Sequence, residues 1–318
     1  LWRAFQTRVI NMAFDVAVIG AVGIDTNVYL SDSKVNLSVE TSFGVNLDCI
    51  GQAGGYACQG FERLGYRVCF IGYVGEDFSG KYIRQILTEL DIDTSLLMID
   101  PLGTKRSVNL MYMNGGRKNF YDGKGAMNLC PNIEDIRSHL SGTKLAHVNI
   151  VNWTRFLLKP LKEEGLILSV DIQDVTDSDD PYRKDFIEEA DVLFFSSTNF
   201  ADPYHLIKKY LEIRGDRIVV CGMGKRGCAI GSNKGIEHFD PVELEEPVVD
   251  ANGAGDSLAV GFLSSHYFEG YSIEDAILRG QIAARYCCTK KGTSSELITS
   301  EHLDRLFKQI NTSRKQDQ

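Results

Sequence analysis

The sequence contains no apolar run that approaches the roughly 18 residues a membrane-spanning helix needs. Positive charge is also scarce, because 34 Lys and Arg residues stand against 43 Asp and Glu residues and give a formal net charge of −9. Nucleic-acid-binding proteins normally carry a basic face, so this balance argues against that class. It does not exclude anionic small molecules, since local groups hold them. We therefore expect neither a membrane nor nucleic acid among the partners.

Spaced metal ligands are missing as well. None of the eight cysteines belongs to a C-x-x-C pair, and the six histidines show no H-x-x-x-H spacing. Most cysteines lie in apolar stretches, where a reduced thiol behaves as a small hydrophobic side chain. These features disfavour a zinc site and a disulfide framework, and they favour a cytoplasmic protein.

The ends of the chain differ from its body. Residues 1–11 carry scattered arginines and no long apolar segment, which disfavours a secretory signal. We expect them to form an N-terminal extension, either native or introduced by cloning, ahead of one domain at 12–310. Residues 311–318 are polar, and we expect a frayed tail there.

Short apolar strands alternate with helical segments along most of the domain. The predicted strands are residues 14–20, 68–72, 145–151, 166–171, 191–195 and 217–221, and the predicted helices include 79–90, 182–189 and 203–213. Such alternation is typical of βαβ units. It predicts a three-layer α/β/α sandwich with a central, mostly parallel sheet covered on both faces.

Two regions break this alternation. Residues 28–50 and 104–121 alternate polar and apolar side chains without a helix signal, which predicts half-exposed antiparallel strands. We interpret them as a small β lid over a cleft at the carboxyl ends of the sheet strands, where α/β proteins bind ligands. A pair of long hairpins is the structural alternative. The apolar strand faces of such a lid could pair in a homodimer, so the sequence leaves both a homodimer and a monomer open.

The most informative segment is Asp250-Ala-Asn-Gly-Ala-Gly-Asp256. Its glycine-rich turn, Gly253-Ala254-Gly255, leads directly into a helical pattern that begins near Asp256. The free N–H groups at the start of a helix bind phosphate without a basic side chain. A carboxylate at that end is stabilised by the helix dipole and can accept a proton from a hydroxyl. The structural alternative is an ordinary N-cap aspartate.

This segment resembles the C-terminal D-T-x-G-A-G-D signature of the PfkB/ribokinase family of carbohydrate kinases. Residues 54–65, continuing through 71–80, resemble the N-terminal signature of the same family, and Gly20 and Asp25 fit its opening strand. The resemblance covers about residues 12–310. It implies a ribokinase-like fold with a small β lid.

The resemblance implies roles for the last four residues of the C-terminal signature. Asp256 would be the general base that takes the proton of the acceptor hydroxyl. The amides of Gly253, Ala254 and Gly255 would form an anion hole for the transferring phosphoryl group, on which charge develops.

The resemblance also implies binding residues. The acceptor side consists of Asp25, Gly54, Gly55 and Gln59, the last in place of the family's Asn. The nucleotide side consists of Ser196, Gly222, Gly224, Gly227 and Gln281. A monovalent cation, K⁺, would lie near Asp250 and Asn252, and ATP with Mg²⁺ would supply the phosphoryl group. The family's N-x-x-E motif is missing, because residues 196–199 read Ser-Ser-Thr-Asn.

We therefore predict an ATP-dependent phosphotransferase that moves the γ-phosphoryl group of Mg·ATP to a hydroxyl of a sugar or sugar-like acceptor. A nucleoside kinase on the same scaffold and a catalytically silent sugar-binding protein stay open as alternatives. A P-loop at residues 75–81 is rejected, because Tyr82 stands where the Mg²⁺-binding hydroxyl would be. Arg117 is either a solvated turn cation or a contact to an acidic acceptor.

Overall fold

A computed structural model describes residues 13–31, 35–36, 38–113, 116–200 and 202–316. Its main sheet has the strand order β13-β12-β11-β10-β9-β8-β1-β4-β5. The strands are β1 (Val16–Ile19), β4 (Val68–Val74), β5 (Leu97–Ile99), β8 (Leu145–Asn149), β9 (Ile167–Asp174), β10 (Val192–Ser196), β11 (Ile218–Gly222), β12 (Cys228–Ser232) and β13 (Gly235–Phe239). The strands from β11 to β5 are parallel, while β12 and β13 form an antiparallel edge.

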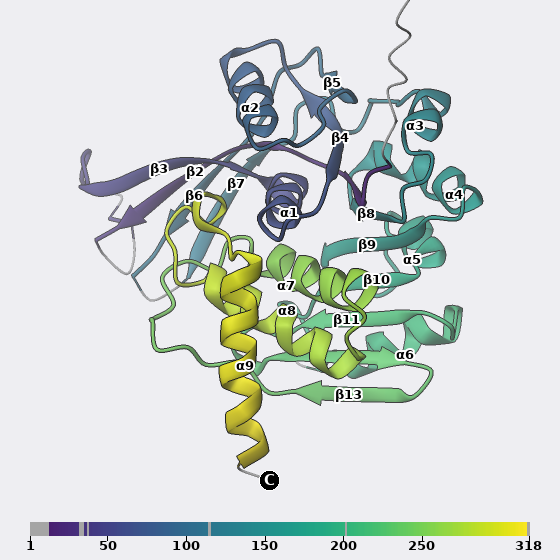
Figure 1. Cartoon of the computed structure of the whole chain (residues 1–318). Coiled ribbons are helices and arrows are strands. Elements are labelled where there is room, and N and C mark those ends of the chain that lie inside the picture. The colour runs from purple at the N-terminus through teal and green to yellow at the C-terminus, as the bar shows by residue number, and fades with distance from the viewer. Residues whose placement is uncertain (1–12, 32–34, 37, 114–115, 201, 317–318) are drawn as a thin grey trace, which may run out of the picture.

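Helices cover both faces of this sheet, as predicted (Figure 1). One layer contains α1 (Gln52–Arg63), α2 (Phe78–Glu89), α7 (Ala254–Leu263), α8 (Ile273–Cys287) and α9 (Ser300–Gln316). The other contains α3 (Ile133–His139), α4 (Arg155–Glu163), α5 (Lys184–Glu189) and α6 (Tyr204–Ile213). The result is a three-layer α/β/α sandwich.

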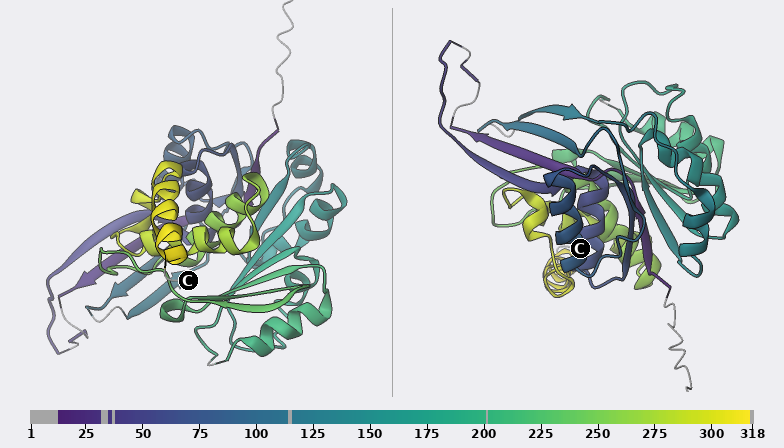
Figure 2. Two further views of the ribbon diagram at one scale, coloured as in Figure 1. Left: turned by 60° about the horizontal axis from the view of Figure 1, so that its bottom comes forward. Right: turned by 90° about the horizontal axis from the view of Figure 1, so that it is seen from above.

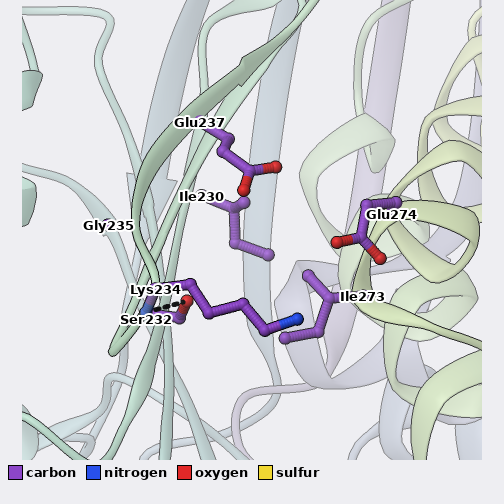
Figure 3. A pocket seen from close by; sticks show the side chains of 7 residues that line it. All are labelled: Ile230, Ser232, Lys234, Gly235, Glu237, Ile273 and Glu274. Carbon is purple, nitrogen blue, oxygen red and sulfur yellow. Dashed lines mark hydrogen bonds between the residues drawn. The ribbon is translucent and has the colours of Figure 1, made fainter.

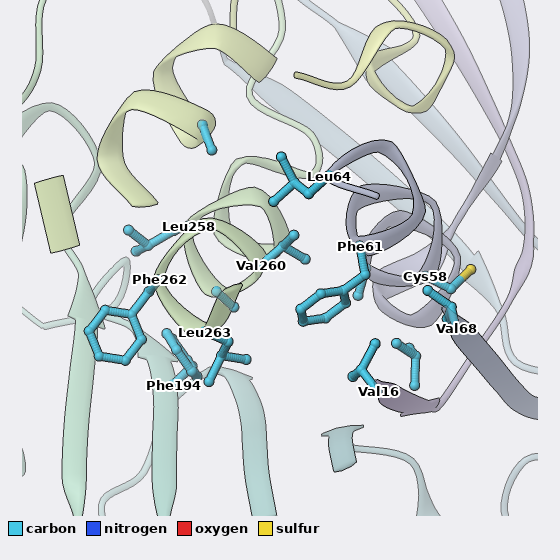
Figure 4. Close-up of a cluster of buried hydrophobic side chains, with 14 of the residues drawn as sticks. Val16, Cys58, Phe61, Leu64, Val68, Phe194, Leu258, Val260, Phe262 and Leu263 are labelled. Atoms are coloured by element: carbon cyan, nitrogen blue, oxygen red, sulfur yellow. The ribbon is translucent and has the colours of Figure 1, made fainter. Parts of the chain in front are cut away.

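Each layer has its own hydrophobic core, because successive residues of a buried strand point to opposite faces of the sheet. Val16 and Val18 of β1 belong to one core, and Ala17 and Ile19 belong to the other. Figure 4 shows the first core, in which Phe61 of α1 lies near Val16. Both cores exclude water from the centre of the sheet and so fix the positions of its strand ends.

A second sheet, which we call the lid sheet, projects from this body (Figure 2). Its strands are β2 (Gly23–Leu30), β3 (Gly44–Gly51), β6 (Lys105–Met111) and β7 (Arg117–Asp122), in the order β3-β2-β6-β7. Strands β2 and β6 pair in parallel. The alternative of two separate hairpins is therefore wrong, because this parallel pairing joins both segments into one sheet that begins at Gly23.

Two further details differ from the sequence-based expectations. Strands β12 and β13 were not predicted, because the exposed side chains of β13 give it no apolar pattern. Helix α9 continues to Gln316, so residues 311–316 are helical and do not form a frayed tail. The expected extension at residues 1–11 lies outside the described residues. Within the described part of the chain, no helix combines the length and apolar character required to cross a membrane.

Helices α7 and α8 pack closely because glycines face each other. A Cβ atom on Gly280 would lie 2.7 Å from the carbonyl oxygen of Leu258, and one on Gly261 would lie 2.9 Å from the Cα atom of Gly280. A main-chain atom cannot move aside as a flexible side chain can. Helix α8 thus packs directly against the buried side of α7, the helix that begins at the proposed anion hole.

We expect Gly280→Ala to lower the free energy of unfolding by about 1–3 kcal/mol, because the added methyl group separates two packed helices. Thermal denaturation of the purified variant measures the effect. Gly215→Ala is the matched control, since the nearest atom to its added Cβ lies 3.8 Å away. Equal melting temperatures for Gly280→Ala and the unmodified protein would contradict this account of the packing.

Candidate active site

The start of α7 has the geometry of an anion-binding turn. Gly253 caps the helix with a φ of 72°, in the left-handed region. A Cβ atom there would lie 2.9 Å from the ring of Tyr56, so both conformation and space favour glycine. The N–H of Ala254 makes only a long contact of 3.4 Å to Ala251 O, and no described main-chain carbonyl accepts from the N–H of Gly255. These amides are therefore available to a ligand, as the turn predicts.

Asp256 lies in the first turn of α7 and is partly exposed. Desolvation raises the pKa of its carboxyl group well above the usual range, and the negative charges of Asp171 and Asp25 raise it further. Burial also raises the pKa of Asp171, in the second half of β9, to about 6. We call these three residues the acidic centre. A carboxylate with a raised pKa is a stronger base than an ordinary aspartate and suits proton abstraction.

Asp25 is held by side chains that sequence analysis did not single out. Gln52 donates from Nε2 to Oδ1 of Asp25 at 2.6 Å and also to Oγ of Ser107 at 2.7 Å. The hydroxyl of Tyr56 donates to Oδ2 of Asp25 at 3.1 Å. Gln52 has a φ of 67°, an unfavourable conformation for a residue with a side chain. The sequence could not reveal the role of Gln52, because its positive φ at the start of α1 is a property of the folded backbone.

The other expected acceptor residues lie inside the packing of α1. A Cβ atom on Gly54 would lie 2.6 Å from the carbonyl oxygen of Ala21, and Gly55 faces Val22. Gln59 donates from Nε2 to Gly55 O at 2.7 Å, within the helix. The structure therefore brings Gln52 and Tyr56 to Asp25, and it does not bring Gln59 there.

Polar side chains form cross-strand rows on the inner face of the lid sheet. Asn27, Asn109 and Asn119 are in register on β2, β6 and β7. Their amides form a chain, in which Asn119 donates to Asn109 at 2.8 Å and Asn109 donates to Asn27 at 2.9 Å. Asp25 and Ser107 are partners in the adjacent row. These rows place carboxylate, amide and hydroxyl groups on one face, of which Asn119 is exposed and the others are buried.

The expected nucleotide residues divide into two groups. Ser196 ends β10 in register with Gly222 at the end of β11, so both lie at the carboxyl edge of the sheet. Gly224 and Gly227 follow in the next turn, with φ values of 57° and 80°. A Cβ atom on Gly227 would lie 2.1 Å from the carbonyl oxygen of Phe239, which explains the need for glycine. The structure brings this group together.

Gln281 comes from α8 and contacts the end of that turn. Its Nε2 donates to Cys228 Sγ at 3.0 Å and to Phe239 O at 3.2 Å. Its side chain is buried against β12 and β13. The structure therefore gives Gln281 a packing role behind the nucleotide turn.

The residues expected near a monovalent cation are bonded to the protein. Asp250 is 2% exposed, and its Oδ2 accepts a hydrogen bond of 2.5 Å from the hydroxyl of Tyr29. Its Oδ1 accepts from the main-chain N–H of Asn252 at 2.8 Å. Both carboxylate oxygens thus have donors, so this arrangement does not fit a K⁺ site.

A cluster of Cys69, Asp93 and His139 brings three metal-ligating side chains within 4.8 Å of one another. Asp93 accepts hydrogen bonds from Ser95 and pairs with Nε2 of His139 at 2.9 Å. Burial raises the pKa of the Cys69 thiol well above its usual range, which keeps the proton that a metal would have to replace. Hydrogen bonding accounts for this cluster without an ion.

Two small hollows occur elsewhere. Figure 3 shows one between the β12–β13 hairpin and the start of α8, where Lys234 and Glu274 lie at its rim. The other lies between α1 and α7 and includes Tyr56 and Ser257. Neither hollow contains a residue of the acidic centre.

The fold and these strand-end residues define an α/β protein with a lid sheet beside a helix N-terminus. The profile of the pfkB family carbohydrate kinases matches residues 13–300. The chain belongs to this family, whose reaction transfers a phosphoryl group from ATP to a hydroxyl of a carbohydrate.

Individual relatives agree with this assignment. The chain is 28% identical to an acarbose 7(IV)-phosphotransferase from Actinoplanes sp., over 89% of this chain and 95% of that protein. It is 26% identical to a nucleoside kinase from Methanocaldococcus jannaschii, over 78% of this chain and 82% of that protein. Among solved structures, the microbiome-derived acarbose kinase Mak1 superimposes with a TM-score of 0.81 at 28% identity, covering 93% of this chain and 99% of that one. The fold is ribokinase-like.

The acidic centre predicts a specific pH dependence. Asp256 must be deprotonated to act as a base, and its pKa is raised, so kcat/KM should increase with pH along a limb that lies above the range of a free aspartate. Asp171→Asn removes the neighbouring negative charge that raises the pKa of Asp256 more than Asp25 does. The rising limb of the pH profile of this variant should therefore shift to lower pH. Steady-state rates across pH at saturating Mg·ATP measure both limbs.

ATP titrates in the same way in both measurements, so it does not affect the comparison. Asp216→Asn is the control, because Asp216 is 76% exposed and pairs with Arg214 away from the carboxyl edge of the sheet. A limb in Asp171→Asn at the same pH as in the unmodified protein would show that Asp171 does not act on the base.

Proposed function

We propose that the protein phosphorylates a hydroxyl of a sugar or sugar-like acceptor with Mg·ATP, using Asp256 as the general base. The observation that carries this proposal is the position of a carboxylate with a raised pKa beside unused amides at the start of α7. The base and the groups that stabilise the transferring charge then share one helix turn. Such preorganised donors lower the barrier most where charge develops.

The chain's own residues account for each step of the transfer. Asp25, oriented by Gln52 and Tyr56, accepts a hydrogen bond from an acceptor hydroxyl and so positions the sugar. Asp256 takes the proton from the attacking hydroxyl. The amides of residues 253–255 donate to the oxygens of the phosphoryl group, and the lid sheet excludes water that would compete as a nucleophile.

A divalent cation fits the excess negative charge of the acidic centre. Asp171 is buried, and no cationic side chain among the described residues forms an ion pair with it. Mg²⁺ is a hard cation that prefers carboxylate and phosphate oxygens. When bound with ATP, it neutralises charge on the phosphates, and Asp171 is the residue that would hold it.

The inner face of the lid sheet supports an acceptor that carries hydroxyl groups. Asn119 is the exposed member of the asparagine row, and its amide can bond a sugar hydroxyl, while Asn27 and Asn109 are buried and hold it in place. Tyr121, the cross-strand partner of Ser107, is 53% exposed on the same face and could stack on a nucleobase, so the two acceptor classes are separated by the substrate panel below. The acarbose kinases among the relatives act on such polyhydroxylated acceptors.

We expect Asp256→Asn to lower kcat by about 10²- to 10⁴-fold, because the amide keeps the shape of the side chain and loses the base. ATP binding should be nearly unchanged, since the amides of the turn remain. A coupled ADP-release assay over monosaccharides, oligosaccharides, sugar phosphates and nucleosides measures turnover, and calorimetry measures ATP binding. Asp216→Asn again serves as the control that keeps normal turnover.

Each other outcome has a defined meaning. Near-normal turnover in Asp256→Asn would remove this residue from its catalytic role. Turnover with nucleosides alone would replace the sugar acceptor with a nucleoside. Sugar binding without ATP turnover in the unmodified protein would indicate a silent sugar-binding protein.

The outer face of the lid sheet supports a homodimer. Val108 is 38% exposed and Phe120 is 55% exposed, and the two are cross-strand partners on β6 and β7. The half-buried Val28 and Leu110 are partners on the same face. An exposed apolar patch with polar neighbours, here Asp48 and Lys118, is typical of a protein interface.

We expect sedimentation to show a dimer and Phe120→Glu to sediment as a monomer, because a carboxylate would be buried in the interface. Phe78→Glu is the matched control, since Phe78 is 85% exposed on α2, outside the lid sheet, and should leave the dimer intact. A monomer of the unmodified protein at all concentrations would contradict the proposal.

A further inference from the structure

The lid sheet is bonded directly to the segment that leads into the anion-binding turn. Tyr29, on β2, donates its hydroxyl hydrogen to Oδ2 of Asp250 at 2.5 Å. The same hydroxyl oxygen accepts a hydrogen bond of 2.7 Å from the main-chain N–H of Gly292, in the loop after α8. One side chain therefore links β2, the segment before α7 and the loop after α8.

Asn252 is held by the lid sheet in a similar way. Arg117, on β7, donates to Oδ1 of Asn252. The Nδ2 of Asn252 donates to Oδ1 of Asn27 at 3.2 Å and contacts the sulfur of Met111 at 3.5 Å. Arg117 is thus more than a solvated turn cation. Because Tyr29, Met111 and Arg117 share one cross-strand row, this row is the edge along which the lid sheet meets residues 250–252.

Positive charge near Asp250 also comes from the protein. The ammonium group of Lys291 lies 4.9 Å from the centroid of the Tyr29 ring. Arg117 lies close enough to Asp250 to favour its ionised form. A cation that bound Oδ2 of Asp250 would compete with the hydrogen atom of the Tyr29 hydroxyl for that oxygen and would lie near two cationic side chains. The buried carboxylate is satisfied without it, in agreement with the general pairing of buried charges.

We infer that the hydroxyl of Tyr29 occupies the place of a monovalent cation at Asp250. Tyr29 is thereby a positioning residue that couples the lid sheet to the amides of residues 253–255. The inference rests on the proposed kinase activity for its kinetic part only. It states that transfer in this protein does not depend on K⁺. It also states that removal of one oxygen atom, that of Tyr29, opens a cation site.

The test compares the unmodified protein with Tyr29→Phe in K⁺ and in tetramethylammonium at equal ionic strength. The unmodified protein should show the same kcat and the same melting temperature in both salts. Tyr29→Phe should lose roughly tenfold in kcat in tetramethylammonium, the scale of one hydrogen bond to a charged group, with the KM for ATP unchanged. K⁺ should restore much of that loss and raise the melting temperature, since it binds the native state at the vacated carboxylate.

Two controls separate this role from a general effect on folding. Tyr66→Phe removes a hydroxyl that donates to Glu269 at 2.9 Å, remote from the lid sheet, and should leave kcat and the salt response unchanged. Tyr29→Phe combined with Asp250→Asn should show no response to K⁺, because the charge that attracts the cation is absent. A purely structural packing role of the Tyr29 side chain would not produce this pair of results.

Three results would overturn the inference. They are a strong K⁺ requirement in the unmodified protein, an unchanged kcat in Tyr29→Phe, and a loss of kcat in Tyr29→Phe without any response to K⁺. The melting temperatures need no turnover, so they remain decisive about the cation site even if the proposed kinase activity fails.

Discussion

A carboxylate held at the positive end of a helix is the constraint on which the rest of the site depends. Asp256 lies in the first turn of α7, where the helix dipole favours its charge, while burial and the nearby Asp171 oppose it. The pKa of this carboxyl group is therefore set by opposing influences, of which burial is the larger and raises it. The parallel sheet sets this balance, because it brings the end of β9 and the start of α7 to the same edge.

The lid sheet has two roles in this arrangement. Its inner face carries Asp25 and the asparagine row that would face an acceptor. The next row of the same face, which contains Tyr29 and Arg117, is bonded to the segment that precedes the anion-binding turn. In the proposed mechanism, direct hydrogen bonds would therefore connect acceptor recognition to phosphoryl-group stabilisation, and movement of the lid sheet would affect both.

Long apolar strands and glycine-rich turns made much of the fold predictable. The alternation of strands with helices led to the three-layer sandwich, and the segment 250–256 led to the helix N-terminus with its carboxylate. The parallel pairing of β2 with β6 was not predictable, because the two strands lie about eighty positions apart and their alternation fits an antiparallel partner equally well. Gln59 was selected by its place in a signature, yet its amide bonds within α1, while Gln52 turns to Asp25.

The sequence by itself determined the type of fold, the family and the position of the proposed base, because each depends on short segments whose spacing and residue types are local properties of the chain. Only the tertiary structure decided which side chains hold Asp25 and what satisfies Asp250. Those partners come from segments far apart in the sequence, as Tyr29 and Asp250 do, and side chains such as these show no local periodicity. Their pairing follows from how two sheets and a helix pack, and packing is a property of the whole chain.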